Sequence, residues 1–202
     1  MKKFASFLPA LLLLSFTLAG NSITDKERKD AADLLQKTEQ GVFDAVKGLS
    51  DAQLKYKAAP DRWSIEECVI HIATTEGALW GMTDGALKQP ANPEKRAEIK
   101  ITDDKVVPMM EDRSRKVKTS EMLEPKNSPY KSLDDALKAF KTNREKLIDY
   151  VKTTNDDLRN HVATLPFGSL DCYQMILFMG AHSNRHTQQI DEVKADAGYP
   201  KN

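Results

Sequence analysis

Along most of the chain, apolar residues recur every three or four positions, the spacing of one face of an α-helix. Four long stretches carry this pattern, and each follows a residue able to cap a helix. The four predicted helices begin at Thr24, at Ser64, at Ser132 and near Ser169, and they extend to about Gly48, Lys88, Val151 and Ala195. Alternation typical of strands is weak throughout, so the pattern indicates an all-α protein.

Two of these starts carry a reciprocal capping pattern. Thr24 is followed by Glu27, and Ser64 by Glu67, the arrangement in which each side chain bonds the other residue's backbone N–H. Between the second and third helices lie roughly 40 residues, far more than a tight helix hairpin needs. A short helix is expected there, from Thr102 or Asp103 through Val107 and then from Met109 to about Arg113. We therefore predict a four-helix bundle with a long crossover between helices two and three.

The first twenty residues have a different character. Lys2 and Lys3 precede an uncharged apolar run that ends in small residues near Ala19 and Gly20, the layout of a secretory signal peptide. An uncleaved membrane anchor is the alternative, but the run is short for a bilayer span. We predict a signal peptide over residues 1–20 and one bundle domain over residues 21–202, exported, and periplasmic if the source is Gram-negative.

The charge balance removes one class of function. The 202 residues include 30 basic and 30 acidic side chains, and loss of two lysines with the signal peptide would leave 28 against 30. A nucleic-acid-binding protein normally carries a basic surface, so no nucleic-acid partner is expected. No stable membrane insertion is expected after cleavage either.

Two of the four histidines lie four positions apart in the stretch GAHSNRHTQQI, as His182 and His186. Residues at this spacing share one face of a helix. They continue an apolar row that includes Met175, Met179 and Ile190, so they are predicted to point into the bundle. Two readings stay open at this point: core histidines satisfied by polar neighbours, or metal ligands.

His71 favours the second reading. It lies in the second predicted helix, seven residues past Ser64, and a bundle can bring this helix against the fourth. His71, His182 and His186 would then supply three imidazole nitrogens, a set that suits Zn²⁺ or Ni²⁺ with positions left for water. The residues three before these histidines are not glutamates, so the di-iron pattern is absent. His161 is expected in a loop, away from the set.

The two cysteines are predicted to remain unbridged, although an exported protein with two cysteines often forms a disulfide. If the histidines converge, Cys68 lies about one turn from His71 and Cys172 about 15 Å from His182. Their Cα atoms would then be more than ~7 Å apart, beyond the reach of a disulfide. Cys68 is expected to be a small buried residue, with a fourth metal ligand as the alternative.

Three neighbours have more than one reading. Gln189 either holds His186 in the metal-binding tautomer, contacts a substrate, or lies on the helix surface. Trp63 either packs in the core, as a residue before a helix cap often does, or stacks on a ligand. Arg185 is expected to be a salt-bridged surface residue rather than a substrate clamp.

Three segments together resemble the DinB-like superfamily, and within it the YfiT-like branch. They are LSDAQLKYKAAPDRWSIEECVIH, MEDRSRKVK and AHSNRHTQQI. The matching positions in the first and last are Trp63, Ser64, Glu67, His71, Arg185, His186, Gln189 and Ile190. The resemblance spans nearly the whole chain after the signal peptide.

The resemblance implies a bundle that holds a divalent metal through His71, His182 and His186. It further implies transfer of a low-molecular-weight thiol to an electrophile, or hydrolysis, with the metal activating the nucleophile. The partner would be a small-molecule substrate, and a homodimer is left open. The alternative is a non-catalytic binding or stress-related protein whose metal is structural or absent.

Overall fold

The computed structural model describes residues 23–201. The predicted signal peptide, residues 1–20, lies outside the described residues. The elements in chain order are α1 (Asp25–Val46), α2 (Asp51–Lys55), α3 (Ile65–Leu87), η1 (Pro93–Glu98), α4 (Asp103–Glu111), η2 (Glu121–Leu123), η3 (Pro125–Asn127), α5 (Leu133–Thr153), β1 (Val162–Leu165), β2 (Gly168–Asp171) and α6 (Cys172–Lys194). The four long helices form a bundle, which confirms the predicted fold class.

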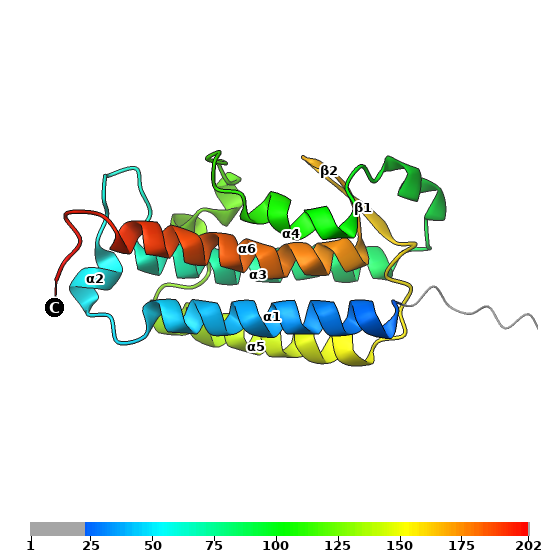
Figure 1. The fold of residues 1–202 in the computed structure, drawn as a ribbon, viewed down its shortest axis with the longest axis horizontal. Helices are drawn as coiled ribbons and strands as arrows, with labels where there is room; N and C mark the ends of the chain where they lie inside the picture. Colours follow the sequence, from blue (N-terminus) through cyan, green and yellow to red (C-terminus); the bar gives the residue numbers. More distant parts are fainter. Residues whose placement is uncertain (1–22, 202) are drawn as a thin grey trace, which may run out of the picture.

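Of the long helices that follow each other in the chain, α3 and α5 pack side by side, whereas α1 and α3, and α5 and α6, do not. α1 and α3 each pack against α5 and α6, so α1 lies diagonally from α3, and α5 from α6 (Figure 1). α3 and α5 run side by side in the same direction, and the crossover returns the chain to the end where α3 began. α4 lies on the outside of α6 along that return path. The long crossover thus makes a parallel α3–α5 pair feasible.

The predicted helix caps are present. The Thr24 side chain accepts a hydrogen bond from the backbone N–H of Glu27 at 3.2 Å, and the Glu27 carboxylate accepts one from the N–H of Thr24 at 2.6 Å. Ser64 and Glu67 repeat this exchange at the start of α3. These caps satisfy backbone donors that a helix leaves free at its first turn. They fix where α1 and α3 begin.

One short element was not predicted from the sequence. Residues 162–171 form a two-stranded antiparallel hairpin, with Val162 opposite Asp171 and Leu165 opposite Gly168. Gly168 has a φ of 139°, which favours glycine at the end of the tight turn. The fourth long helix therefore begins at Cys172 rather than near Ser169. The crossover helix is one piece, α4, and not two pieces separated at Pro108.

A buried ion pair joins the four long helices at the centre of the bundle. Arg144 of α5 is fully buried and donates to both carboxylate oxygens of Glu76 of α3, at 2.6 and 2.7 Å. It also donates to the Leu35 carbonyl and the Thr38 hydroxyl of α1, and to the Ser183 hydroxyl of α6. Each guanidinium nitrogen has an acceptor, so the buried charge is satisfied.

No helix among the described residues is long and apolar enough to cross a membrane.

Candidate metal centre

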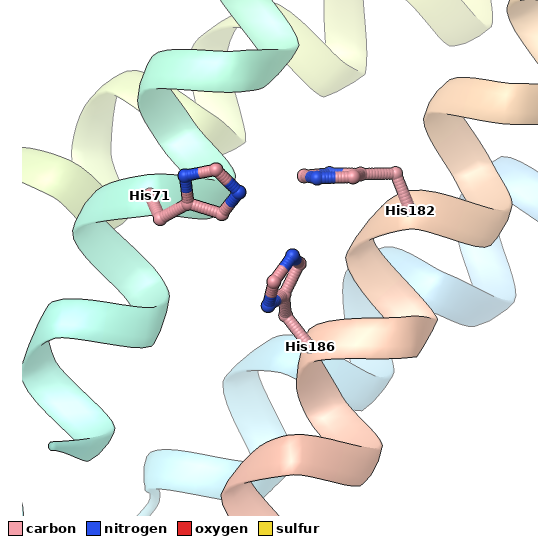
Figure 2. A group of neighbouring side chains, drawn as sticks. All are labelled: His71, His182 and His186. Carbon is pink, nitrogen blue, oxygen red and sulfur yellow. The ribbon is translucent and has the colours of Figure 1, made fainter. Parts of the chain in front are cut away.

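The three predicted ligand histidines converge inside the bundle. His71 comes from α3, and His182 and His186 come from successive turns of α6 (Figure 2). One ring nitrogen from each lies within 4.8 Å of the others. The ring centroids are 4.5 Å apart for His71 and His186, 4.6 Å for His182 and His186, and 5.1 Å for His71 and His182. The α3–α6 contact therefore creates a three-imidazole cluster.

The cluster is almost closed to solvent. The exposed fraction is 2% for His71 and 7% for both His182 and His186. Burial lowers the pKa of His71 to about 4. Burial, reinforced by the neighbouring imidazoles, also lowers the pKa of His182 and of His186 well below the usual value. All three rings are therefore neutral near pH 7, the form in which histidine binds a metal.

Hydrogen bonds orient two of the three rings. Nδ1 of His71 lies 2.8 Å from the carbonyl oxygen of Leu123 in η2, so it must carry the proton and donate. Nδ1 of His186 lies 3.0 Å from Oε1 of Gln189 and donates in the same way. Nε2 is thus the unprotonated nitrogen on both rings, and on His71 it has the Thr75 hydroxyl 3.4 Å away. Gln189 accepts the Nδ1 proton of His186, in agreement with the first of its predicted roles.

The donor set fits a divalent transition metal. Three neutral imidazoles suit Zn²⁺, Ni²⁺ and related ions, and a fourth protein ligand would be expected in a closed structural site. Among the described residues, no carboxylate or cysteine joins the three histidines in a metal-sized group. Cys68 is fully buried in an apolar cluster, and burial raises the pKa of its thiol to about 12. The three histidines could thus hold an ion that keeps positions for other ligands.

Aromatic side chains flank the cluster at two sides. The ring of Trp63 lies 4.7 Å from that of His71 and 5.9 Å from that of His186. Phe178, one turn before His182 on α6, lies 6.3 Å from its ring in a nearly parallel orientation. Trp63 is partly exposed, and it packs both on the histidines and against a cluster of buried apolar residues. Its packing against the apolar cluster agrees with the first of its two predicted positions.

Arg185 does not behave as predicted. Its exposed fraction is only 6%, and it forms no surface salt bridge among the described residues. Its guanidinium instead donates to backbone carbonyls at the end of α4 and in the segment that follows: those of Met110, Asp112 and Arg115. Arg185 is charged and follows a helix turn of mostly polar residues, so the sequence suggested a surface position. The structure uses it to hold the crossover against α6.

A second arginine contact was not foreseen from the sequence. Arg113 of the crossover forms a two-pronged ion pair with Glu192 of α6, at 2.6 and 2.7 Å. Its NH1 group lies 3.5 Å from Oε1 of Gln189, the oxygen that also accepts from His186. Nearby, Asn184 of α6 donates a hydrogen bond to the Glu111 carboxylate at the end of α4, at 2.7 Å. Polar residues on the outer side of α6 thus anchor the crossover.

The remaining histidine and the cysteines lie outside the cluster. His161 is in the loop before β1, as predicted, and its two ring nitrogens contact the carbonyl oxygens of Asp157 and Gln89. Cys68 and Cys172 are free and buried, and they belong to different apolar clusters. The predicted absence of a disulfide between them agrees with this arrangement.

Fold and cluster together define a helical-bundle protein with a three-histidine group suited to a metal ion. The sequence pattern of the DinB superfamily matches residues 34–190, and the chain belongs to that superfamily. It is 30% identical over 153 residues to the uncharacterized protein YuaE of Bacillus subtilis strain 168, covering 75% of this chain and 90% of YuaE.

A solved structure has a similar fold. YfiT from Bacillus subtilis superposes with a TM-score of 0.60 at 14% identity, and the match covers 89% of this chain and 92% of YfiT. YfiT is described as a probable metal-dependent hydrolase with an unusual four-helix bundle topology. At this identity the likeness establishes a shared fold.

Proposed function

We propose that this chain is a metal-dependent enzyme that acts on a small electrophile, as a hydrolase or a thiol transferase. His71, His182 and His186 would hold a divalent cation, with Zn²⁺ or Ni²⁺ the best match to three imidazoles. Membership of the DinB superfamily and the fold shared with YfiT support the proposal, because YfiT is described as a probable metal-dependent hydrolase.

One observation carries the proposal. His71 and His186 each donate from Nδ1 to a carbonyl oxygen, which leaves both Nε2 atoms available inside a cluster no wider than 4.8 Å. Core histidines that merely filled space would need no such common orientation. A ligand set with its outer nitrogens held by acceptors is typical of metal sites in proteins.

The residues around the three histidines have different roles in the proposed reaction. When bound, a divalent cation lowers the pKa of a nucleophile and stabilises negative charge as it develops. The Leu123 carbonyl and the Gln189 amide oxygen keep the imidazoles in the ligating tautomer. Trp63 and Phe178 limit access of bulk water to the three rings. A small water-poor site strengthens every electrostatic contact within it.

A non-catalytic role is the competing function, and the burial of the cluster favours it. With exposed fractions of 7% or less, the histidines could serve an ion that only braces α3 against α6. The two functions differ in ligand exchange. A catalytic ion binds an added small ligand such as cyanide or a thiol, whereas a closed structural ion does not.

The test is elemental analysis of protein purified without a histidine tag, repeated on His182→Ala. We expect about one equivalent of a divalent metal in the natural protein and a loss of at least tenfold in affinity for the variant, because it removes a direct ligand. Cobalt-loaded protein titrated with a thiol should then change its visible spectrum.

His161→Ala is the matched control, because His161 lies outside the cluster, and it should keep its metal. Absence of metal from the natural protein, even after incubation with zinc, nickel or cobalt, would refute the proposal. Metal retained without any spectral response to added ligands would favour the structural role.

We also propose that the chain is exported after removal of residues 1–20. The basic start followed by an apolar run supports this proposal. Mass spectrometry of the protein from the extracytoplasmic fraction should give a mature N-terminus at about residues 20–23. A full-length mass, or recovery only from the cytoplasm, would contradict export.

Sedimentation of the same material would test whether the protein is a homodimer, which the sequence left open.

A further inference from the structure

The crossover touches both helices that carry the histidines. We define the crossover strap as residues 112–124, the segment between the end of α4 and the end of η2 and its cap. Its first part is held on α6 and its last part on α3. Residues 114–118, in between, are exposed and have no helix or strand. The strap therefore connects α6 to α3 at the level of the histidine cluster.

The contact with α3 involves a ligand histidine directly. The carbonyl oxygen of Leu123 accepts the Nδ1 proton of His71 at 2.8 Å. Just beyond the strap, the Ser128 hydroxyl lies 2.7 Å from the Thr74 hydroxyl, one turn further along α3. The position of the strap thus decides whether His71 has its acceptor.

The contact with α6 reaches the second ligand through one intermediate. Arg113 is paired with Glu192 and also approaches Oε1 of Gln189 at 3.5 Å. The same oxygen accepts the Nδ1 proton of His186 at 3.0 Å. Because one oxygen accepts from both groups, the guanidinium fixes which way the Gln189 amide faces. Arg113 therefore acts on His186 through Gln189.

Polar contacts, rather than apolar packing, hold the strap. Val117 is 76% exposed and Met122 is 81% exposed, so the two large apolar side chains of its outer part bury little surface. Few buried apolar contacts and exposed backbone are the features of segments that open locally at low cost. The histidines beneath are at most 7% exposed. Undocking of the strap would remove the acceptor of His71 and loosen that of His186.

We propose that docking of the crossover strap and ion binding by the three histidines are coupled, with Arg113 and the Leu123 carbonyl as the positioning groups. This inference rests on the proposed function, because it concerns the same metal site. A docked strap presents two imidazoles in the ligating tautomer, and an ion that fixes these imidazoles favours the docked strap in return. Such coupling is reciprocal by thermodynamic necessity.

The coupling also gives the strap a role in access. A small substrate can reach an ion among nearly closed imidazoles only when a covering segment moves. The strap is the polar-anchored segment that contacts both ligand helices. Strap opening would then admit substrate at the same time as it weakens the hold on His71 and His186.

The experiment measures zinc affinity and hydrogen exchange together. Zinc affinity is obtained by competition with a chromophoric chelator, for the natural protein and for Arg113→Met. Amide exchange of peptides covering residues 112–124 is followed with zinc and with chelator. We expect zinc to slow exchange in these peptides, and Arg113→Met to bind zinc about tenfold more weakly, the effect usual for loss of an outer hydrogen-bond partner.

Two kinds of control separate coupling from general damage. Arg96→Met removes another arginine of the connection between α3 and α5, one that pairs with Asp171 away from the histidines, and it should bind zinc normally. Gln189→Leu should weaken zinc binding as Arg113→Met does. Gln189→Glu keeps an acceptor oxygen for His186 and should restore the affinity.

The outcomes are distinct. Zinc binding with unchanged exchange of residues 112–124, or an Arg113→Met variant with natural affinity, overturns the coupling and leaves the proposed function standing. Failure of the natural protein to bind zinc or any other divalent ion overturns both proposals. Slower exchange with zinc, and weaker binding in Arg113→Met and Gln189→Leu but not in Arg96→Met, supports the coupling.

Discussion

At the scale of single residues, the centre of the bundle is polar. Arg144 and Glu76 are both buried, and their two-pronged pair lies where a helical bundle normally has apolar side chains. Removal of a charge from water costs free energy. The attraction within the pair offsets this cost only because further acceptors on α1 and α6 complete the guanidinium's hydrogen bonds. Each charge therefore depends on the other.

We predict that Arg144→Met destabilises the protein by about 3–5 kcal/mol, because it leaves the Glu76 carboxylate buried without its partner. Urea denaturation followed by circular dichroism measures the change. The double variant Arg144→Met with Glu76→Leu removes both charges and should be more stable than Arg144→Met alone. A double variant whose loss equals or exceeds the sum of the two single losses would show that the charges do not depend on each other.

The burial of several charged residues could not be predicted from the sequence. Arg144, Glu76 and Arg185 are buried, although their residue types are normally exposed. Their burial depends on partners that lie far away in the chain, such as Leu35 for Arg144. A backbone carbonyl acceptor, as at Leu123 for His71, has no sequence signature at all. The three ligand candidates were recognisable by spacing, whereas the groups that orient them were not.

At the scale of elements, α1 and α6 approach closely at Gly180. A Cβ atom placed there would lie 2.9 Å from Cγ of Leu34, too near for ordinary contact. Gly180 is two residues before His182, so this close approach sets the position of the α6 turn that carries this candidate ligand. The glycine is therefore required by packing rather than by its backbone angles.

Gly180→Ala should be destabilising, since overpacking typically costs about 1–3 kcal/mol and outweighs the gain of up to ~1 kcal/mol in helix propensity. Thermal unfolding provides the measurement. Gly81→Ala in α3 is the matched control, because a Cβ there meets nothing within 4 Å. That control should gain stability by up to about 1 kcal/mol. Equal behaviour of the two variants would mean that Leu34 moves aside freely.

The elements differ in how well the sequence predicted them. The starts of α1 and α3 were correct because Thr24 and Ser64 carry complete capping boxes. The hairpin before α6 was missed because each strand has four residues, too few for alternation to stand out. The predicted start of the fourth helix near Ser169 lies within β2, three residues before α6 begins at Cys172.

At the scale of the whole molecule, stability depends on the protonation of the histidine cluster. The pKa of His71 is lowered to about 4 in the folded protein, and those of His182 and His186 are lowered as well. An unfolded histidine has a pKa of about 6.5, so the unfolded chain binds protons first as the pH falls. The contribution is therefore fully present above pH ~6.5 and, for His71, is lost progressively down to about pH 4.

We predict that the metal-free protein loses stability between pH 6.5 and pH 5, by up to about 1.4 kcal/mol per pH unit for each histidine. Denaturant unfolding in the presence of a chelator measures this slope above the range where carboxylates titrate. His71→Phe removes one buried imidazole and should show a shallower slope. An identical slope in that variant would contradict the lowered pKa of His71.

The overall topology was predictable only in part. The length of the connection from Gln89 to Lys131 indicated a crossover, and the bundle has one. The diagonal placement of α1 and α3 left no trace in the helical stripes, because each stripe shows which face is buried and not which helix covers it. Arg144 of α5 and Glu76 of α3 form one of the contacts that join these two helices.

The order of the three candidate ligand histidines along the chain has a consequence for when the protein could bind a metal ion. His71 is in the second long helix, but His182 and His186 are in the last. A nascent chain therefore contains only one of the three candidate ligands for most of its synthesis. The other two are added when translation is nearly finished. Under the export and metal binding proposed above, the ion would come from outside the cytoplasm, and its supply there would limit how much of the protein binds metal.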